Sequence, residues 1–196
     1  MKQFILASKS PRRKEILQTL GIPFEVVTAD TDESSTLQNP YQLVEELSRR
    51  KGEAVRDLLL REGRDLTQTV ILSSDTVVNV DGEIFGKPRD EADACRMLRM
   101  YSGRSHEVVS GICLLNGDRI GVSHDVTEVV FDKMDEEAIL RYVRAEHPYD
   151  KAGAYAIQGA ASVYIQAIHG DFFNVVGLPV HCLYRLYFEI FGENLI

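Results

Sequence analysis

Hydrophobic and polar residues follow two periodicities along this chain, which predict strands that alternate with helices. Short, mainly apolar runs predict strands at residues 4–7, 24–28, 70–72, 77–80, 83–85, 107–115, 121–131 and 163–168. Apolar residues spaced by three or four positions predict helices at residues 11–20, 40–61 and 90–101, and from about 135 and about 179 onward. The first half of the chain is therefore expected to alternate strand and helix.

Local signals mark where these helices begin and end. Ser10 followed by Pro11 suits a helix start, because a serine side chain caps a free N–H group and proline lacks the N–H that the first position leaves unpaired. Asn39 and Pro40 repeat this signal at the longer helix. Gly21 suits the position just after the first helix.

Tight turns in the middle of the chain predict antiparallel pairing. Asp81 and Gly82 favour a two-residue hairpin, and residues 116–118 are expected to turn between two long strands. We therefore predict an α/β fold with mixed α+β elements, in which helices flank a central twisted mixed β-sheet. A chain of 196 residues with 44% hydrophobic content suits one domain over residues 1–196, with two lobes and a cleft between them.

The charge balance narrows the class of partner. Thirty acidic residues against 22 basic ones give a formal net charge of −8, which argues against a nucleic-acid or membrane-surface binder. No window approaches the roughly 20 apolar residues that span a bilayer, and the N-terminal residues lack a signal-peptide core. We expect a cytoplasmic protein in which a local cluster of cations meets any anionic ligand.

The loop after the first strand is the first candidate binding site. A helix start at Pro11 offers free N–H groups and a positive dipole end to an anion. Arg12 and Arg13 add two guanidinium groups that can chelate phosphate oxygens, although two solvated arginines are the simpler interpretation. Cations oppose the dipole at this end of a helix, which favours a functional role.

Other charged residues are ambiguous when they are taken singly. Asp75 follows the strand at 70–72, where a carboxylate can hold a divalent metal or orient a water, but can equally cap a turn. Glu33, Lys51 and Lys87 each fit an exposed surface charge. In residues 150–159, small residues and glycines would let the backbone approach a ligand. Spacing alone thus supports the hypothesis of metal-assisted phosphoryl or nucleotidyl hydrolysis.

Six motifs in order along nearly the whole chain resemble those of the Maf family of nucleoside triphosphate pyrophosphatases. They lie at residues 6–13, 74–78, 86–88, 102–106, 150–159 and 174–179. The resemblance implies hydrolysis of a nucleoside triphosphate between its α and β phosphorus atoms, with a divalent cation, Mg²⁺ or Mn²⁺, as cofactor. It also implies that Asp75 accepts the proton of the attacking water and that Glu33 and Asp75 bind the metal.

The same resemblance supplies the expected substrate contacts. The substrate-binding and specificity residues would be Ser8, Arg12, Arg13, Lys51, Thr76, Lys87 and Gln158. Residues 150–159, together with Arg12, Thr76 and Gln158, resemble the branch that acts on dTTP and UTP, and modified pyrimidine nucleotides such as 5-methyl-UTP and pseudo-UTP are plausible further substrates. The Gln158 amide both donates and accepts, which suits a uracil edge.

Three expectations stay open at this point. Ser74 stands where the family commonly has alanine, and its hydroxyl would lie near the metal and retune selectivity. The family resemblance also implies a homodimer. Two alternative functions compete with the pyrophosphatase: a nucleotide-binding regulator of cell division or septum formation, and a general phosphomonoesterase or inorganic pyrophosphatase.

Overall fold

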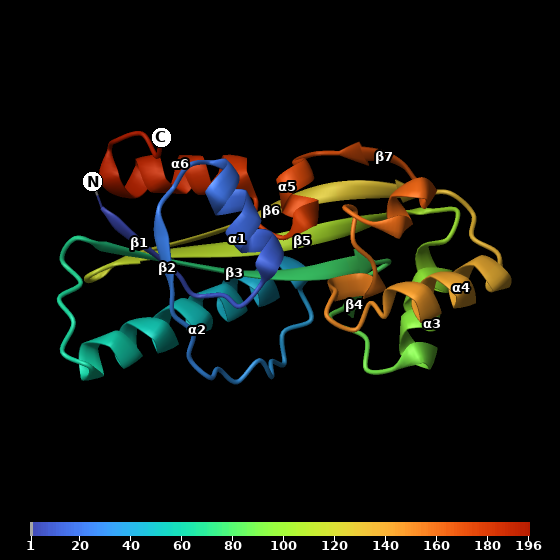
Figure 1. Ribbon diagram of the computed structural model, residues 1–196, viewed down its shortest axis with the longest axis horizontal. Helices are drawn as coiled ribbons and strands as arrows, with labels where there is room; N and C mark the ends of the chain where they lie inside the picture. The colour runs from blue at the N-terminus through green and yellow to red at the C-terminus, as the bar shows by residue number, and fades with distance from the viewer. Residues whose placement is uncertain (1) are drawn as a thin grey trace.

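A seven-stranded mixed sheet runs through the whole molecule (Figure 1). The structure is a computed structural model and describes residues 2–196. The strands are β1 (Gln3–Leu6), β2 (Phe24–Val26), β3 (Thr69–Val80), β4 (Glu83–Phe85), β5 (Ser105–Asn116), β6 (Arg119–Phe131) and β7 (Ile165–His169). The helices are α1 (Pro11–Thr19), α2 (Pro40–Arg61), α3 (Glu91–Tyr101), α4 (Glu136–Glu146), α5 (Phe172–Val176) and α6 (Val180–Phe191), with 3₁₀ turns η1 (Ala152–Ala154) and η2 (Ala160–Tyr164).

The sheet combines parallel and antiparallel pairs, as predicted. Its strand order is β2-β1-β3-β5-β6-β7, and β4 pairs with the far part of β3. β1 pairs in parallel with β2 and β3, whereas the remaining neighbours are antiparallel. The long strands β3, β5 and β6 run from the end of the molecule that carries the two termini toward the end that carries the helices α3 and α4 (Figure 1).

The two faces of β3 are covered by different helices, because successive side chains of a strand point to opposite faces. Even-numbered residues of β3, such as Leu72, pack with α1 and α6 through Leu17 and Leu183. Odd-numbered residues, such as Ile71, pack with α2 through Val55. This alternation follows from the period of two along a strand, and it assigns every later residue of β3 to one face or the other.

The predicted helix starts are confirmed. The Ser10 side chain caps α1 by accepting from the Arg13 N–H, and Asn39 caps α2 by accepting from the N–H groups of Tyr41 and Gln42. Asp81 and Gly82 both have positive φ, 52° and 87°, as a primed hairpin turn requires. No helix among residues 2–196 is long and apolar enough to cross a bilayer.

Three sequence predictions need correction. The strand predicted to stop at residue 72 continues to Val80, so Asp75 lies in the middle of β3 and not at a strand end. The late strand begins at Ile165, because residues before it form η2. The five-residue helix α5 is too short to show a helical periodicity and was not predicted.

Helix α2 lies unusually close to the sheet because a glycine of the helix, Gly52, and a glycine of the sheet, Gly111, lie at the contact. A Cβ on Gly52 would lie 2.6 Å from Leu115 Cδ1 and 2.8 Å from Ser73 Oγ. A Cβ on Gly111 would lie 2.5 Å from the carbonyl carbon of Val44 in α2. Gly111 is also the β5 partner of Asp75 in the sheet register, so the close approach occurs beside that carboxylate.

Candidate active site

A gap in the pairing of β3 creates the candidate site. The parallel partner β1 ends opposite Leu72, and β4 joins the same edge only from Val78 onward. Between these points the edge of β3 has no neighbouring strand and faces a cavity of about 1310 Å³. Ser74 and Thr76 direct their backbone groups to this edge, since Leu72 and Val80 pair on the same side and strand residues alternate.

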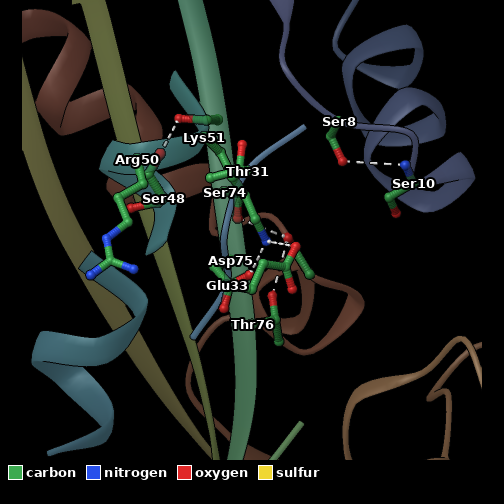
Figure 2. Close-up of polar contacts among 12 residues, drawn as sticks. Ser8, Ser10, Thr31, Glu33, Ser48, Arg50, Lys51, Ser74, Asp75 and Thr76 are labelled. Carbon is green, nitrogen blue, oxygen red and sulfur yellow. Dashed lines mark hydrogen bonds and ion pairs between the residues drawn. The ribbon is translucent and has the colours of Figure 1, made fainter. Parts of the chain in front are cut away.

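Two carboxylates and one ammonium group converge on the α2 face of this edge. Lys51 Nζ lies 2.5 Å from Asp75 Oδ1 and 3.0 Å from Glu33 Oε1. Asp75 is 9% exposed. Burial alone would raise the pKa of Glu33, but the hydrogen bond and charge of Lys51, with the charges of Lys87 and Arg13, lower it overall. Figure 2 shows β3 between α2, which carries Lys51, and the loop that carries Ser8 and Ser10.

Arg13 lies on the opposite face of the same edge and is bound almost entirely by protein atoms. Its Nε donates to Gly177 O at 2.7 Å, and its Nη1 donates to Ser74 O at 2.8 Å and Ser8 Oγ at 3.2 Å. Its Nη2 donates to Thr76 Oγ1 at 3.2 Å. Four of the five guanidinium N–H groups are therefore used within the protein. Burial lowers the Arg13 pKa from its ordinary value, but an arginine stays charged at neutral pH.

Arg12 differs from its neighbour in this respect. Its guanidinium contacts Asp150 Oδ2 at 3.4 Å, which is a long ion pair, and Asp150 also contacts Lys151 Nζ at 2.7 Å. Arg12 lines the cavity. Within residues 2–196 its guanidinium makes only the contact with Asp150, so most of its N–H groups can still bind a ligand. The two arginines therefore differ in their surroundings: Arg13 is held by four hydrogen bonds to protein atoms, whereas Arg12 makes one long contact.

The Gly177 carbonyl joins the site from the C-terminal part of the chain. Besides Arg13, it accepts from Ser74 Oγ at 3.2 Å, and Thr76 Oγ1 lies 3.5 Å away. The expectation that the Ser74 hydroxyl lies near the metal residues is wrong, because residues 74 and 75 alternate across the strand. Ser74 faces Gly177, while Asp75 faces Lys51.

A family model described as "Maf-like protein" matches residues 3–190. The chain belongs to the Maf family. A protein of Symbiobacterium thermophilum named "dTTP/UTP pyrophosphatase" is 47% identical over 182 residues, covering 92% of this chain and 90% of that protein. A protein of the same name from Bacillus cytotoxicus is 40% identical over 186 residues, covering 94% of each. The solved Staphylococcus aureus Ham1 protein has a TM-score of 0.48 and 14% identity, covering 66% of this chain and 72% of that chain, a likeness too slight to carry an inference.

All nine residues that the Maf resemblance implies line this one cavity. They are Ser8, Arg12, Arg13, Glu33, Lys51, Asp75, Thr76, Lys87 and Gln158. Lys87 is close enough for its charge to act on Glu33, and Gln158 is exposed on the residue 150–159 segment. Their individual roles stay predictions, but the residues that seemed like isolated surface charges share one cleft.

Two groups that position the site were not predicted. Arg50 Nη1 donates to Ser34 O at 2.7 Å and Asp32 O at 3.3 Å, and so fixes the backbone on both sides of Glu33. Arg50 also pairs with Glu46, one turn earlier on α2. The i,i+4 spacing of Glu46 and Arg50 is visible in the sequence, but it indicates only a helix surface pair. The Gly177 carbonyl lies in the motif at 174–179, whose sequence does not reveal its partners.

The carboxylates of the cavity are the side chains that could hold a divalent metal. No group of three or more His, Cys, Asp or Glu side chains suited to a metal occurs among residues 2–196. Asp75 and Glu33 nevertheless both reach Lys51 Nζ, so two hard carboxylate donors lie close together. Mg²⁺ is commonly held by one or two carboxylates together with substrate phosphates and waters. The residues therefore fit a metal that arrives with its substrate.

Proposed function

We propose that this chain hydrolyses dTTP and UTP to the nucleoside monophosphate and pyrophosphate. The observation that carries the proposal is the convergence of Asp75, Glu33 and Lys51 at the open edge of β3, in a cavity also lined by Arg12 and Lys87. The Maf relatives named "dTTP/UTP pyrophosphatase" support the substrate, because the chain covers nine-tenths or more of each.

Asp75 is the group proposed to accept the proton of the attacking water. The water oxygen adds to phosphorus, the α–β phosphoanhydride bond breaks, and pyrophosphate leaves while the proton passes to the Asp75 carboxylate. Asp75 is buried but opens onto the cavity, and Lys51 holds one of its oxygens, so the carboxylate is fixed in direction before substrate binds. Such preorganisation lowers the cost of aligning the water.

The cations are proposed to bind the triphosphate and offset the charge that develops on the leaving pyrophosphate. Arg12 can donate two parallel hydrogen bonds to non-bridging phosphate oxygens, because its guanidinium makes only one long contact within the protein. Lys87 and Lys51 add point charges nearer the carboxylates. This division assigns Arg13 to holding Ser74, Thr76 and Gly177 in place.

Asp75 and Glu33 would hold Mg²⁺ or Mn²⁺. When bound, a divalent cation supplies charge that neutralises the phosphate oxygens and lowers the pKa of a coordinated water. The chain's own residues prepare this role, since Arg50 fixes the backbone on both sides of Glu33 and Lys51 keeps the two carboxylates together.

Gln158 is proposed to recognise the base of the nucleotide by hydrogen bonds to the polar edge of the pyrimidine ring. Its amide both donates and accepts, and the exposed side chain is free to turn toward a ligand. Because the 150–159 segment is exposed at Gln158, a substituent on the ring is tolerated, and we include 5-methyl-UTP and pseudo-UTP among the proposed substrates.

The test is a panel of dTTP, UTP, CTP, dATP and GTP with Mg²⁺ or Mn²⁺, with products resolved by chromatography. The proposal expects fastest turnover of dTTP and UTP, with monophosphate and pyrophosphate as first products. Orthophosphate as first product would support a phosphomonoesterase instead. Tight nucleotide binding in calorimetry without turnover would favour the regulator of cell division.

Two further expectations from the family resemblance stay predictions. A homodimer would appear in light scattering at twice the 22.1 kDa mass of the chain. A cytoplasmic location would appear as recovery of the native protein in the soluble fraction of fractionated cells, apart from periplasm and membrane.

A further inference from the structure

Behind the open edge of β3, a chain of hydroxyl groups runs from Arg13 into the sheet. Arg13 Nη2 donates to Thr76 Oγ1 at 3.2 Å, and Thr76 Oγ1 lies 2.8 Å from Ser110 Oγ on the neighbouring strand β5. Ser110 Oγ in turn donates to Asn174 O at 3.0 Å. Ser110 and Asn174 are fully buried, whereas Thr76 is partly open to the cavity.

The two ends of this chain fix the direction of its protons. A guanidinium can only donate and a carbonyl oxygen can only accept. When Ser110 gives its proton to Asn174 O, its oxygen is left to accept from Thr76. The Thr76 proton then points into the sheet, and one lone pair of Thr76 Oγ1 accepts from Arg13. The remaining lone pair is what Thr76 presents to the cavity.

The reverse direction is disfavoured. If Ser110 donated to Thr76, it would give up its hydrogen bond to Asn174 O, because a hydroxyl has one proton. Thr76 would then be left with Gly177 O as its acceptor, 3.5 Å away and beyond the usual range for O–H···O bonds. The arrangement in which Thr76 donates to Ser110 keeps both hydrogen bonds, and in it the Thr76 proton is not available to a ligand.

Asn174, at the inner end of this chain of hydroxyl groups, is held rigidly, which keeps the direction of the hydrogen bonds fixed. The Asn174 side chain donates through Nδ2 to Val108 O at 2.9 Å and to Thr127 Oγ1 at 3.0 Å. These bonds tie the residue to strands β5 and β6. The carbonyl that receives the Ser110 proton is therefore held by the sheet itself.

Thr76 also lies on the side of β3 that faces residues 150–159. Even-numbered residues of β3 share this side, and Gly153 packs so closely on Val78 that a Cβ there would lie 2.5 Å from Val78 Cγ2. Asp75 faces the other way, toward Lys51. The strand edge thus separates the carboxylates on one face from Thr76 and the segment that carries Gln158 on the other.

We propose that Ser110 is a positioning residue that makes the Thr76 hydroxyl a pure hydrogen-bond acceptor, and that this acceptor selects bases with an N–H group at ring position 3. The inference rests on the proposed function. Uracil and thymine carry a proton at N3, whereas cytosine presents a lone pair there, so two acceptors would meet. A site built to pair with an N–H rejects an analogue that lacks it.

The test compares kcat/KM for UTP and CTP in wild type and in the variants Ser110→Ala, Thr76→Val and the double variant. Ser110→Ala frees the Thr76 proton to turn toward the cavity, so the UTP/CTP ratio should fall by about tenfold or more. Thr76→Val should lower the ratio as well. Ser110→Ala should then change the ratio no further in the Thr76→Val background, because it acts through Thr76.

Ser73→Ala is the matched control. Ser73 is a buried serine on β3 whose hydroxyl donates to Ser48 O at 2.6 Å, on the α2 side and away from Thr76. Removing it costs a buried hydrogen bond of the same kind, but the UTP/CTP ratio should stay at the wild-type value. Circular dichroism checks that each variant is folded.

Three outcomes would overturn the proposal: Ser110→Ala slows UTP and CTP equally, its effect on the ratio persists in the Thr76→Val background, or Thr76→Val keeps the wild-type ratio. If wild type does not hydrolyse UTP at all, the proposed function fails by itself. The selectivity is then measured as the ratio of Kd values for UTP and CTP in calorimetry, where the same changes are expected.

Discussion

Replacing Gly111 by alanine tests whether the close approach of α2 to the sheet brings Lys51 to Asp75. Gly111 lies opposite Asp75 in the β3–β5 register, on the face that α2 covers. An added Cβ would lie 2.5 Å from the carbonyl carbon of Val44 and 2.9 Å from the backbone nitrogen of Glu45. Both atoms belong to the helix backbone, so no side-chain rotation relieves the overlap.

The size of the effect follows from these distances. Ordinary van der Waals contact begins at 3.4 Å, and the Val44 carbonyl oxygen lies closer still than the carbonyl carbon, so α2 must withdraw by at least about 0.9 Å at Val44. Overpacking of this kind costs about 1–3 kcal/mol, which for a chain of this length lowers Tm by about 4–8 °C at the middle of that range. Lys51, two turns along the same helix, then moves away from Asp75, and misplacement by about 1 Å can cost up to about 10²-fold in rate.

The assay combines thermal unfolding with steady-state hydrolysis of UTP at a temperature where the variant is fully folded. We expect a lower Tm together with a kcat reduced by about tenfold to a hundredfold. Gly159→Ala is the stability control, because a Cβ there meets its nearest atom at 3.7 Å. A Gly111→Ala protein with wild-type Tm and wild-type kcat would refute the claim that this contact distance sets the site.

Three further perturbations have defined outcomes. Arg50→Lys removes the fork that holds the backbone around Glu33, so half-maximal activity should need about tenfold more Mg²⁺; an unchanged Mg²⁺ titration would contradict the clamp. Arg12→Ala should raise KM for UTP about tenfold and shift Tm by less than about 2 °C, since the pair with Asp150 is long and partly exposed; a loss of several degrees would instead assign Arg12 a structural role. Burial lowers the pKa of His106 to about 3. Its unfolded form takes up a proton below about pH 6.5, so stability present at pH 7 is lost as pH falls, by about 2–3 kcal/mol at pH 4.5. Urea unfolding at both pH values should show this slope reduced in His106→Gln and retained in His169→Gln, an exposed histidine.

Local signals in the sequence account for most of the secondary structure. The caps at Ser10 and Asn39 and the turn at Asp81 act through neighbouring residues, so their consequences are visible over a few positions. The polar run at 73–76 misled the prediction of β3 because polar residues usually end a buried strand. In the fold these side chains are paired with partners distant in sequence, such as Ser48 and Gly177.

The sequence motifs predicted which residues form the candidate site, but they did not predict the contacts that these residues make with one another. The family resemblance named nine residues that line one cavity. It did not distinguish Arg12 from Arg13, since adjacent arginines look alike in a sequence and differ only in what surrounds them. The hydroxyl chain through Ser110 depends on β3, β5 and α5 meeting at one place, which no local pattern records.

The most direct test of the account follows UTP hydrolysis by ³¹P NMR for wild type and Asp75→Asn with Mg²⁺. Wild type should yield UMP and pyrophosphate in equal amounts, and Asp75→Asn should be slower by at least about 10²-fold while still binding nucleotide. UDP and orthophosphate as products of the wild type, or an Asp75→Asn protein that retains the wild-type rate, would contradict it.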